Sequence, residues 1–415
     1  MSMFLYQLAI KLYGMLILMA SPFHRKARLW IEGRKGWSDR LEETLMQNKK
    51  PVIWMHCASV GEFEQGRPIL ERIRSDYPAH LIVLTFFSPS GYELRKHYSG
   101  VDQVLYLPLD TLKNARRFIQ MLNPQLAIFI KYEYWLNILM ACKKANIPCI
   151  LVSAYFRPQQ IFFRWYGSVF LKALRNFSMI VVQDKHSKTL LLKYGINRVV
   201  EAGDTRFDRV LQIASSRNEI PLVEAFISQH TCLVAGSTWP ADEEILAQSL
   251  SHLPKLKYII VPHEIDRHHI NQLKKRMPGA VLYSHIHEAG NLADGQVLIL
   301  DQIGLLSGLY RYADFAYVGG GFGKGIHNIL EAAVYGIPVF FGPAHQKFRE
   351  AGELLQVGGA RCIRDVNELA DELQEHIRSD KKRKDSGEQA GTYVKNNSGA
   401  TDIVMKNIRQ YLNGC

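Results

Sequence analysis

The sequence predicts an α/β protein with two doubly wound domains, each built on a parallel sheet, and an apolar helix at the N-terminus. Its 415 residues are enough for two or three domains. From Pro51 onward, short apolar runs alternate with helical patterns, which is typical of parallel sheets covered by helices on both faces. The alternation breaks over residues 210–230 and then restarts, so we expect two similar halves with a cleft between them.

In the first half, a turn of small residues at 58–61 follows the first strand, and a helix is predicted over 62–75. Strands are expected at Val52–His56, Leu81–Thr85, Val104–Tyr106, Leu126–Ile130, Cys149–Ser153 and Met179–Val182.

In the second half, we expect a helix over 241–251, a loosely ordered polar stretch over 379–398 and a terminal helix over 400–412. Strands are expected at Thr231–Ala235, Lys257–Val261, Val297–Leu300, Phe315–Val318 and Val339–Phe341. The predicted parts are an N-terminal helix (1–30), a first domain (31–211), a second domain (212–395) and a final helix (396–415), for which packing back on the first domain is one arrangement.

The composition excludes several protein classes. Hydrophobic residues make up 47% and charged residues 22%, which is ordinary for a folded soluble chain and excludes disordered, collagen-like and polytopic membrane proteins. Six cysteines without a CxxC pair are too sparse for a disulfide scaffold, a zinc ribbon or a thioredoxin-type motif, so reduced thiols are expected. The net charge of +12 favours an anionic partner, namely nucleic acid, anionic lipid or a phosphorylated substrate, or else serves solubility alone.

The N-terminal segment is mostly apolar from Met3 to Phe23, interrupted by Gln7 and Lys11, and a basic cluster follows it. The uninterrupted part, 12–23, is shorter than the roughly 20 residues that span a bilayer, and no secretory cleavage site is evident. This pattern fits a membrane anchor or an interfacial helix with a basic flank, and a buried core helix is the alternative. If the helix spans, the positive charge after it keeps the rest of the chain cytoplasmic.

The second half contains a glycine-rich loop between Gly319 and Gly325, placed after a strand and before a predicted helix. Glycines at Gly321, Gly323 and Gly325 would let backbone amides approach a phosphate, aided by the helix dipole. A plain strand-to-helix turn is the alternative, and neither GxGxxG with its downstream acid nor GxxxxGK[ST] is matched.

The predicted helix after this loop carries His327 and Glu331 on one face, with Asn328 beside them, and Glu331 is well placed for ribose hydroxyls. A second loop, with Gly236, Ser237 and Thr238, could touch the same phosphate or could simply cap the following helix.

Several motifs together resemble a known family. The segment His327–Ala332, with Gly336-x-Pro338-Val339, looks like the donor-binding element of GT-B glycosyltransferases. The more specific matches are to 3-deoxy-D-manno-octulosonic acid (Kdo) transferases: His56-x-x-Ser59-Val60-Gly61-Glu62 resembles their H-x-x-S-V/I-G-E signature, and similar elements are Thr85–Gly91, Glu133–Asn137, Gly203–Asp208 and Val234–Thr238.

The resemblance implies a GT-B fold, with two Rossmann-like domains facing a central cleft, an acceptor-binding first domain and a donor-binding second one. It implies an inverting, metal-independent transfer of Kdo from CMP-Kdo to the tetraacyl lipid A precursor, without a cofactor, at the cytoplasmic side of the inner membrane. Glu62 would be the general base. Acceptor-binding residues would be Ser59, Gly61, Ser88, Ser90, Glu133 and Arg157; donor-binding residues would be Arg206, Gly236, Ser237, Thr238, His263, Gly321, Gly323, Gly325, His327, Asn328 and Glu331.

The residues alone leave other roles open. A Glu at position 62 is also what a helix needs in its first turn, and Glu133 could form an ion pair with Lys131. The sequence departs from the family at Lys131, where a second acid is frequent, and at Pro262-His263-Glu264, where Pro-Arg-His is usual. Arg206 stands where a lysine is common, which keeps the charge and changes its geometry.

Residues 157–198 combine eight Lys or Arg residues and one Asp with interleaved aromatic rings. Such mixing suits an acceptor that is both phosphorylated and acylated, together with anionic lipids of the membrane surface. It also suits single-stranded nucleic acid, or an ordinary amphipathic helix with a buried aromatic face. We expect no nucleic-acid partner and no metal, since no DxD motif or trusted zinc spacing is present. The rival functions are a UDP-sugar transferase of the same fold and a non-enzymatic binder of anionic lipid or nucleic acid.

Overall fold

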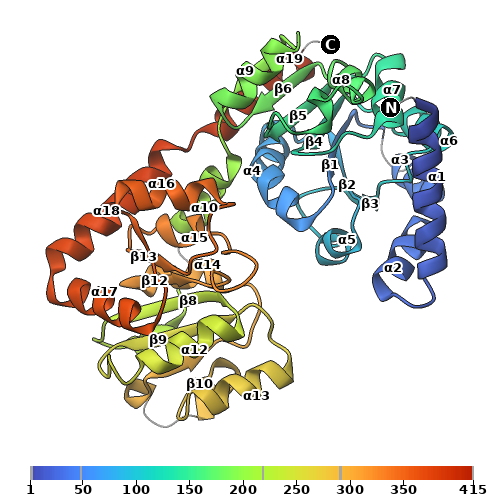
Figure 1. Cartoon of the computed structure of the whole chain (residues 1–415). Coiled ribbons are helices and arrows are strands. Elements are labelled where there is room, and N and C mark those ends of the chain that lie inside the picture. The colour runs from blue at the N-terminus through green and yellow to red at the C-terminus, as the bar shows by residue number, and fades with distance from the viewer. Residues whose placement is uncertain (1–2, 47–48, 217–218, 289–291, 414–415) are drawn as a thin grey trace. The chain divides into compact units, whose positions relative to one another are not determined.

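The computed structural model describes residues 3–46, 49–216, 219–288 and 292–413. The chain forms two compact units: Met1–Arg209 with Ser398–Cys415 (unit 1), and Val210–Asn397 (unit 2). Each unit contains a seven-stranded, all-parallel sheet with helices on both faces (Figure 1).

The sheet of unit 1 has the strand order β3-β2-β1-β4-β5-β6-β7, in which the order reverses at β1, as in doubly wound folds. All six predicted strands are present, and the three-residue β7 is an additional edge strand. The strands are β1 (Val52–Cys57), β2 (Leu81–Phe86), β3 (Gln103–Tyr106), β4 (Leu126–Ile130), β5 (Cys149–Ala154), β6 (Met179–Val182) and β7 (Val199–Glu201).

The helices of unit 1 alternate with these strands, and the last one comes from the C-terminus of the chain. They are α1 (Met3–Ala20), α2 (Arg25–Arg34), α3 (Trp37–Met46), α4 (Val60–Asp76), α5 (Pro89–Arg95), α6 (Leu112–Leu122), α7 (Leu136–Lys144), η1 (Ile161–Phe163), α8 (Ser168–Leu174), α9 (Lys185–Lys193) and α19 (Ala400–Leu412). Helix α10 (Thr205–Ser215) passes from unit 1 into unit 2.

The core of unit 1 has two layers because successive strand residues point to opposite faces of the sheet. Val52 and Trp54 of β1 pack in one hydrophobic cluster, and Ile53 and Met55 pack in the other. Every residue of the central strands is buried, as expected for a parallel sheet covered on both faces. Helix α19 supplies residues to the second cluster and packs beside α4, so the C-terminal segment completes this layer.

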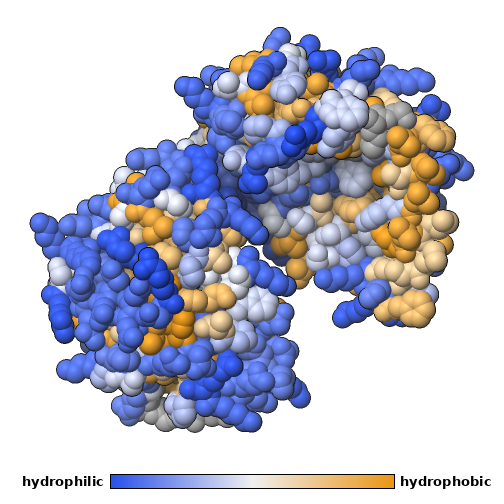
Figure 2. All heavy atoms as spheres, viewed as in Figure 1, coloured by the Kyte–Doolittle hydropathy of each residue, from blue (hydrophilic) through white to orange (hydrophobic). Residues whose placement is uncertain are grey.

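Helix α1 is docked along unit 1 by one face. The Tyr6 hydroxyl donates to Asp110 at 2.5 Å, the Gln7 amide donates to Asn137, and a side chain at Gly14 would meet Leu109 at 2.7 Å. Its other face is apolar and exposed, with the Leu16 and Met19 side chains 63% and 66% exposed. Figure 2 shows these apolar side chains as an orange strip along the helix. By length and composition, this 18-residue helix could cross a membrane.

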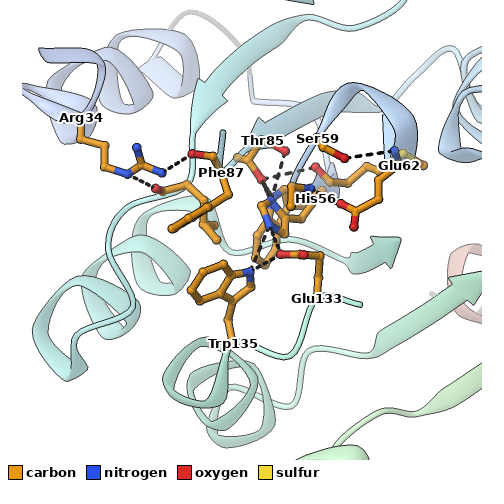
Figure 3. Close-up of polar contacts among 12 residues, drawn as sticks. Arg34, His56, Ser59, Glu62, Thr85, Phe87, Glu133 and Trp135 are labelled. Carbon is orange, nitrogen blue, oxygen red and sulfur yellow. Dashed lines mark hydrogen bonds and ion pairs between the residues drawn. The ribbon is translucent and has the colours of Figure 1, made fainter. Parts of the chain in front are cut away.

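Arg34 ties α2 to the edge of the sheet (Figure 3). Its guanidinium donates to the carbonyls of Leu107 and Phe87, both at 2.8 Å, and lies 3.8 Å from the ring centroid of Trp30. Burial lowers the pKa of this group to about 9, so it stays protonated at neutral pH.

The flat, forked geometry of this guanidinium predicts that lysine is a poor substitute. Arg34→Lys keeps the charge but leaves partly buried carbonyls without a donor, so we expect the free energy of unfolding to fall by about 1–3 kcal/mol. Arg28→Lys, on an exposed position of the same helix, is the matched control and should change the free energy by less than about 0.5 kcal/mol. Denaturant titration of both variants measures the difference, and equal midpoints would refute the role of Arg34.

The sheet of unit 2 has the order β10-β11-β9-β8-β12-β13-β14. The sequence predicted five of these strands and missed β10 and β14, which are only two and three residues long. The strands are β8 (Cys232–Thr238), β9 (Lys257–Pro262), β10 (Val281–Leu282), β11 (Val297–Ile299), β12 (Phe315–Val318), β13 (Val339–Phe341) and β14 (Ala360–Cys362).

The helices of unit 2 include several single turns. They are α11 (Pro221–Ile227), α12 (Pro240–Ser249), α13 (Arg267–Arg276), η2 (Tyr283–Glu288), η3 (Leu292–Asp294), α14 (Leu306–Leu309), η4 (Tyr310–Tyr312), α15 (Leu330–Ala333), α16 (Arg349–Val357), α17 (Val366–Arg378) and α18 (Asp380–Asn396).

The prediction of a loosely ordered stretch over 379–398 is wrong. This segment forms α18, a 17-residue helix whose first turn is capped by the Ser379 hydroxyl. This polar segment contains two small residues, Gly387 and Gly391, at which the helix packs closely against the backbone of Gly336. A side chain at position 387 would collide with that backbone. The break expected over 210–230 likewise contains most of α10 and all of α11.

Candidate functional site

The residues predicted to bind the acceptor lie at the carboxyl-end edge of the sheet in unit 1, where β1, β2, β4 and β5 end, with Arg157 following β5. After β1, Ser59 caps helix α4 by accepting a hydrogen bond from the amide of Glu62 at 3.4 Å. Gly61 is exposed, and the nearest atom to a side chain there would be the Ser59 hydroxyl at 4.0 Å. The turn therefore leaves open space directly beside Glu62.

The Glu62 side chain folds back over this turn and is 9% exposed. Its Oε2 accepts a hydrogen bond from the amide of Ala58 at 2.5 Å. Burial, followed by the negative charge of Glu133, raises the pKa of Glu62 to about 7, well above its ordinary value, against the opposing effects of backbone hydrogen bonds and Lys131. A carboxyl group with this pKa is suited to accept a proton near neutral pH.

Glu133 is fixed in place by a network of rings (Figure 3). Its Oε2 lies 2.9 Å from Nε2 of His56 and accepts a hydrogen bond from the Trp135 indole at 2.5 Å. The other ring nitrogen of His56, Nδ1, lies 2.8 Å from the hydroxyl oxygen and 3.1 Å from the carbonyl oxygen of Thr85. Because His56, Glu133 and Trp135 are buried or partly buried, the orientation of Glu133 beside Glu62 is well defined.

Ser88 and Ser90 follow β2 at the same edge. Ser88 caps helix α5 through a hydrogen bond from the Gly91 amide at 3.1 Å, and its hydroxyl lies 3.2 Å from that of Ser90. Only Ser90 is exposed. Ser88 therefore has a structural function in addition to its predicted one.

Lys131 contacts the ring of Tyr132 at this edge, and two further cations act on the Tyr132 hydroxyl through their charge. Lys131, at a positive φ of 67°, places Nζ 5.3 Å from the ring centroid, and the charges of Arg157 and Arg206 both lower the pKa of Tyr132. Burial has the larger, opposing effect and raises that pKa overall. Arg206, predicted to bind the donor, lies in unit 1 and pairs with Asp204 at 2.8 Å.

In unit 2, the predicted donor-binding residues gather where the neighbouring strands β9, β8 and β12 end. The His263 ring stacks against both Trp239 and His327, with ring centroids 4.8 Å and 4.4 Å away. The Trp239 indole donates to Nε2 of His327 at 2.9 Å. Burial, followed by repulsion from His263, lowers the pKa of His327 to about 4, so this imidazole is neutral at physiological pH.

The glycine loop is held mainly by its own hydrogen bonds. The amides of Gly323 and Gly325 both donate to the carbonyl of Gly320, and the amide of Gly320 donates to Asp242 at 2.8 Å. Gly321 has no room for a side chain because the backbone of Gly342 would lie 2.4 Å from it. Close backbone packing thus explains Gly321 at least as directly as phosphate binding does, whereas a side chain at the exposed Gly323 would meet only the Gly320 carbonyl oxygen, at 3.7 Å.

The expectation of a helix through His327 is wrong. Helix α15 begins at Leu330 and lasts a single turn, so His327 and Asn328 lie in the loop before it. The Asn328 amide donates to Glu331 at 2.9 Å, and its oxygen accepts from the amide of Leu330. The reason is local: Gly325 adopts a φ of +135°, and the amide of His327 bonds back to Gly319 rather than entering a helical ladder.

The loop after β8 is similarly constrained. A side chain at Gly236 would lie 2.1 Å from the Tyr310 hydroxyl, and Ser237 adopts a left-handed conformation with φ of 53°. Thr238 is fully buried and donates to Glu243 at 3.2 Å. Of these three predicted donor contacts, Ser237 is the side chain left partly exposed.

Sequence reasoning missed His56, Lys131 and Asp242 as site residues. In the sequence, His56 stood out only as the first residue of the His56-x-x-Ser59-Val60-Gly61-Glu62 motif. Lys131 stood out only as a departure from the family pattern. Asp242 is 1% exposed and accepts hydrogen bonds from the Trp239 amide, the Gly320 amide and the Tyr317 hydroxyl. The sequence signal that could have identified Asp242 is its position three residues after Trp239, the residue that precedes helix α12, where an acid often bonds back to the start of a helix. Within the described ranges, no group of three or more His, Cys, Asp or Glu residues could hold a metal ion.

Comparisons with known proteins agree with this picture. A family model described as 3-deoxy-D-manno-octulosonic-acid transferase (kdotransferase) matches residues 35–209. The chain is 32% identical over 338 residues to the 3-deoxy-D-manno-octulosonic acid transferase of Aquifex aeolicus, covering 80% of this chain and 87% of that protein. It is 29% identical over 378 residues to the enzyme of the same name from Haemophilus influenzae, covering 87% of each chain.

Solved structures share the fold at low sequence identity. A UDP-GlcNAc 2-epimerase from Neisseria meningitidis, bound to UDP-GlcNAc, aligns with a TM-score of 0.59 at 13% identity over 86% of this chain and 100% of that one. A glycosyltransferase from Rickettsia africae aligns with a TM-score of 0.56 at 15% identity over 88% of this chain and 100% of that one. With two parallel seven-stranded sheets, a GT-B fold and this degree of identity to its relatives, the chain belongs to the 3-deoxy-D-manno-octulosonic acid transferase family of glycosyltransferases and is a Kdo transferase.

Proposed function

We propose that this Kdo transferase takes Kdo from CMP-Kdo, delivers it to the tetraacyl lipid A precursor during lipopolysaccharide core biosynthesis, and uses Glu62 as its general base. The observation that carries the proposal is the buried carboxyl of Glu62, which lies beside an open glycine turn and has a pKa raised to about 7. A base tuned to this range is half ionised at neutral pH and still accepts a proton readily.

In the proposed reaction, an acceptor hydroxyl attacks the anomeric carbon of Kdo and forms the new glycosidic bond. The bond from that carbon to the phosphate oxygen of CMP breaks, and CMP leaves with its electron pair. The hydroxyl proton passes to Glu62. Because the hydroxyl attacks on the side opposite the leaving group, the anomeric centre is inverted. Glu133, held by His56 and Trp135, orients the acceptor beside Glu62.

The donor half of the proposal involves unit 2. Ser237, His263 and the neutral His327 offer polar contacts and a flat stacked surface, and Glu331 is available for ribose hydroxyls. Because the loop amides are mostly used internally, we assign the phosphate chiefly to side chains, including exposed Lys324 within the loop. Gly321 and Gly325 then act by allowing close packing, the exposed Gly323 leaves space for the donor, and Arg206 acts by its charge at the edge of unit 1.

The lipid acceptor and membrane surface are proposed to meet unit 1. Helix α1 presents an exposed apolar face, and Trp165 is 92% exposed between Arg164 and Tyr166. An exposed indole beside cations favours a membrane interface that contains anionic lipids. We therefore place the enzyme at the cytoplasmic side of the inner membrane.

A defined assay tests the function. Purified protein, CMP-Kdo and the lipid A precursor should release CMP only when the precursor is present, and the product mass gives the number of Kdo units added. Absence of CMP release would refute the donor and acceptor assignment. Inhibition by UDP rather than CMP would instead favour a UDP-sugar donor.

The pH dependence gives a second expected result. The base acts only when deprotonated, so kcat/KM should fall about tenfold per pH unit below the Glu62 pKa of about 7 and level off above it. Lys131 lowers that pKa, so Lys131→Met should move the midpoint to higher pH. Initial rates between pH 5 and 9 measure both midpoints; a downward shift in the variant would contradict this electrostatic account.

A further inference from the structure

Unit 1 contains a groove that the sugar-transfer site does not use. It lies between α7 and α8, next to the first described residue of α1, and has a volume of about 930 Å³. The size is within the roughly 300–1,000 Å³ of small-molecule sites. Five apolar residues line it: Met3, Leu136, Met140, Val169 and Ala173.

Asn176 and four cations complete the lining of this groove; the cations are Lys143, Lys144, Lys172 and Arg175. All four are exposed, and no acidic residue lines the groove with them. Within the part of the chain that the structure describes, none of them forms an ion pair, and Arg175 donates to the carbonyl of Tyr194. An apolar channel with unmatched positive charge is complementary to an anionic amphiphile.

The charged end of the groove lies away from Glu62. Helix α7 begins after the carboxyl end of β4 and ends before β5, so Lys143 and Lys144 lie toward the opposite edge of the sheet. Helix α8 ends before β6, which places Arg175 toward that same edge. An anionic group bound by these cations is therefore about one strand length from the proposed base, roughly 15–20 Å.

The groove is also continuous with the apolar face of α1. Met3 lines it, and Phe4 and Leu8, which follow on the same helix, are 75% and 44% exposed. Figure 1 shows the start of α1 beside α7. A lipid acyl chain from the membrane that covers the apolar face of α1 could therefore enter the groove without crossing a polar surface.

From this combination we infer a binding site for an anionic membrane phospholipid, with one acyl chain in the groove and its phosphate held by the four cations. The inference rests on the membrane contact proposed above and does not depend on the sugar-transfer chemistry. Such a lipid would fix α1 and α8 relative to the membrane surface.

Photocrosslinking tests this site directly. Full-length protein is incorporated into phosphatidylcholine nanodiscs that contain a trace of phosphatidylglycerol with a diazirine at the end of one acyl chain. Peptides from α7 and α8 that include Met140 or Val169 should carry the label, and a phosphatidylcholine probe of the same chain length should label them at least about fivefold less. Met140→Trp and Val169→Trp, which fill the groove, should abolish labelling of α7 and α8 and preserve labelling of α1.

Charge reversal gives a second test of the groove, with a matched control in unit 2. Lys143→Glu with Lys144→Glu should reduce groove labelling at least about tenfold, at about fivefold per lost cation. Lys381→Glu with Lys384→Glu, at exposed positions of α18 in unit 2, makes the same change in net charge and should leave labelling unchanged.

Three results would overturn the inference: labelling confined to α1, equal labelling by the two probes, or loss of the label when the lipid A precursor is added. The first would remove the groove site and leave membrane association intact. The last would assign the groove to an acyl chain of the acceptor.

Discussion

Replacement of Glu62 by glutamine should lower the rate of Kdo transfer by about 10²–10⁴-fold, the usual contribution of a positioned base. Glutamine preserves the size of the side chain and can still accept the hydrogen bond from the Ala58 amide, so α4 should keep its start. The variant should therefore bind CMP as the wild type does and fail in the chemical step. Single-turnover rates and CMP titration by calorimetry separate these two quantities.

The matched control for this variant is Glu64→Gln. Glu64 lies two residues further along α4 and is partly exposed. It pairs with Arg95 at 2.9 Å and lies 3.6 Å and 3.7 Å from Arg209 and Arg67. Its loss should leave the rate within about twofold, because partly exposed ion pairs contribute little. Equal losses in the two variants would mean that Glu62 acts only through the charge or stability of α4.

The second large effect is expected in unit 2. Asp242→Ala leaves two buried donors, the Gly320 amide and the Tyr317 hydroxyl, and one partly buried donor, the Trp239 amide, without an acceptor. At about 1–3 kcal/mol for each unsatisfied group, partly relieved by water, the free energy of unfolding of unit 2 should fall by about 3 kcal/mol or more. Because Asp242 holds both Trp239 and the glycine loop in place, the affinity of the Asp242→Ala variant for CMP should also fall.

Asp242→Asn is the matched control. One Asp242 oxygen, Oδ2, accepts from both the Trp239 and the Gly320 amides, and the side-chain oxygen of asparagine can replace it. The asparagine NH2 group then faces the Tyr317 hydroxyl, which can turn to accept, so most of the stability and of the CMP affinity should return. Denaturant unfolding and CMP titration of both variants measure the outcome. Wild-type stability in Asp242→Ala would contradict the role of this carboxylate.

The sequence predicted the strands well because a parallel sheet buried on both faces requires continuous apolar runs. It pointed to Glu62 through the resemblance of the His56–Glu62 segment to a family signature, because the small-residue turn alone fits a first-turn helix acid equally well. The short edge strands β10 and β14 gave no such signal at two and three residues. Helix α18 was missed because its packing depends on Gly387 and Gly391 meeting residues 50 positions earlier in the chain, which no local pattern records.

The donor site shows a different limit. Five glycines between Gly319 and Gly325 look like a phosphate loop in the sequence, but the amides of Gly320, Gly323 and Gly325 donate to partners within the unit. A side chain at Gly321 would collide with the backbone of Gly342. A glycine pattern reports that the backbone is crowded or twisted, and the partner that causes the crowding is visible only in three dimensions. The three-ring stack of Trp239, His263 and His327 joins the ends of separate strands and was equally invisible.

Chemical rescue of Glu62→Ala is the most direct measurement of proton transfer to position 62. Removal of the side chain leaves space beside Gly61 for a small carboxylate. Added formate should restore Kdo transfer in proportion to its concentration in Glu62→Ala and have no effect on Glu62→Gln, where the space stays filled. If Glu62→Ala transfers Kdo at the wild-type rate without formate, Glu62 is not the base.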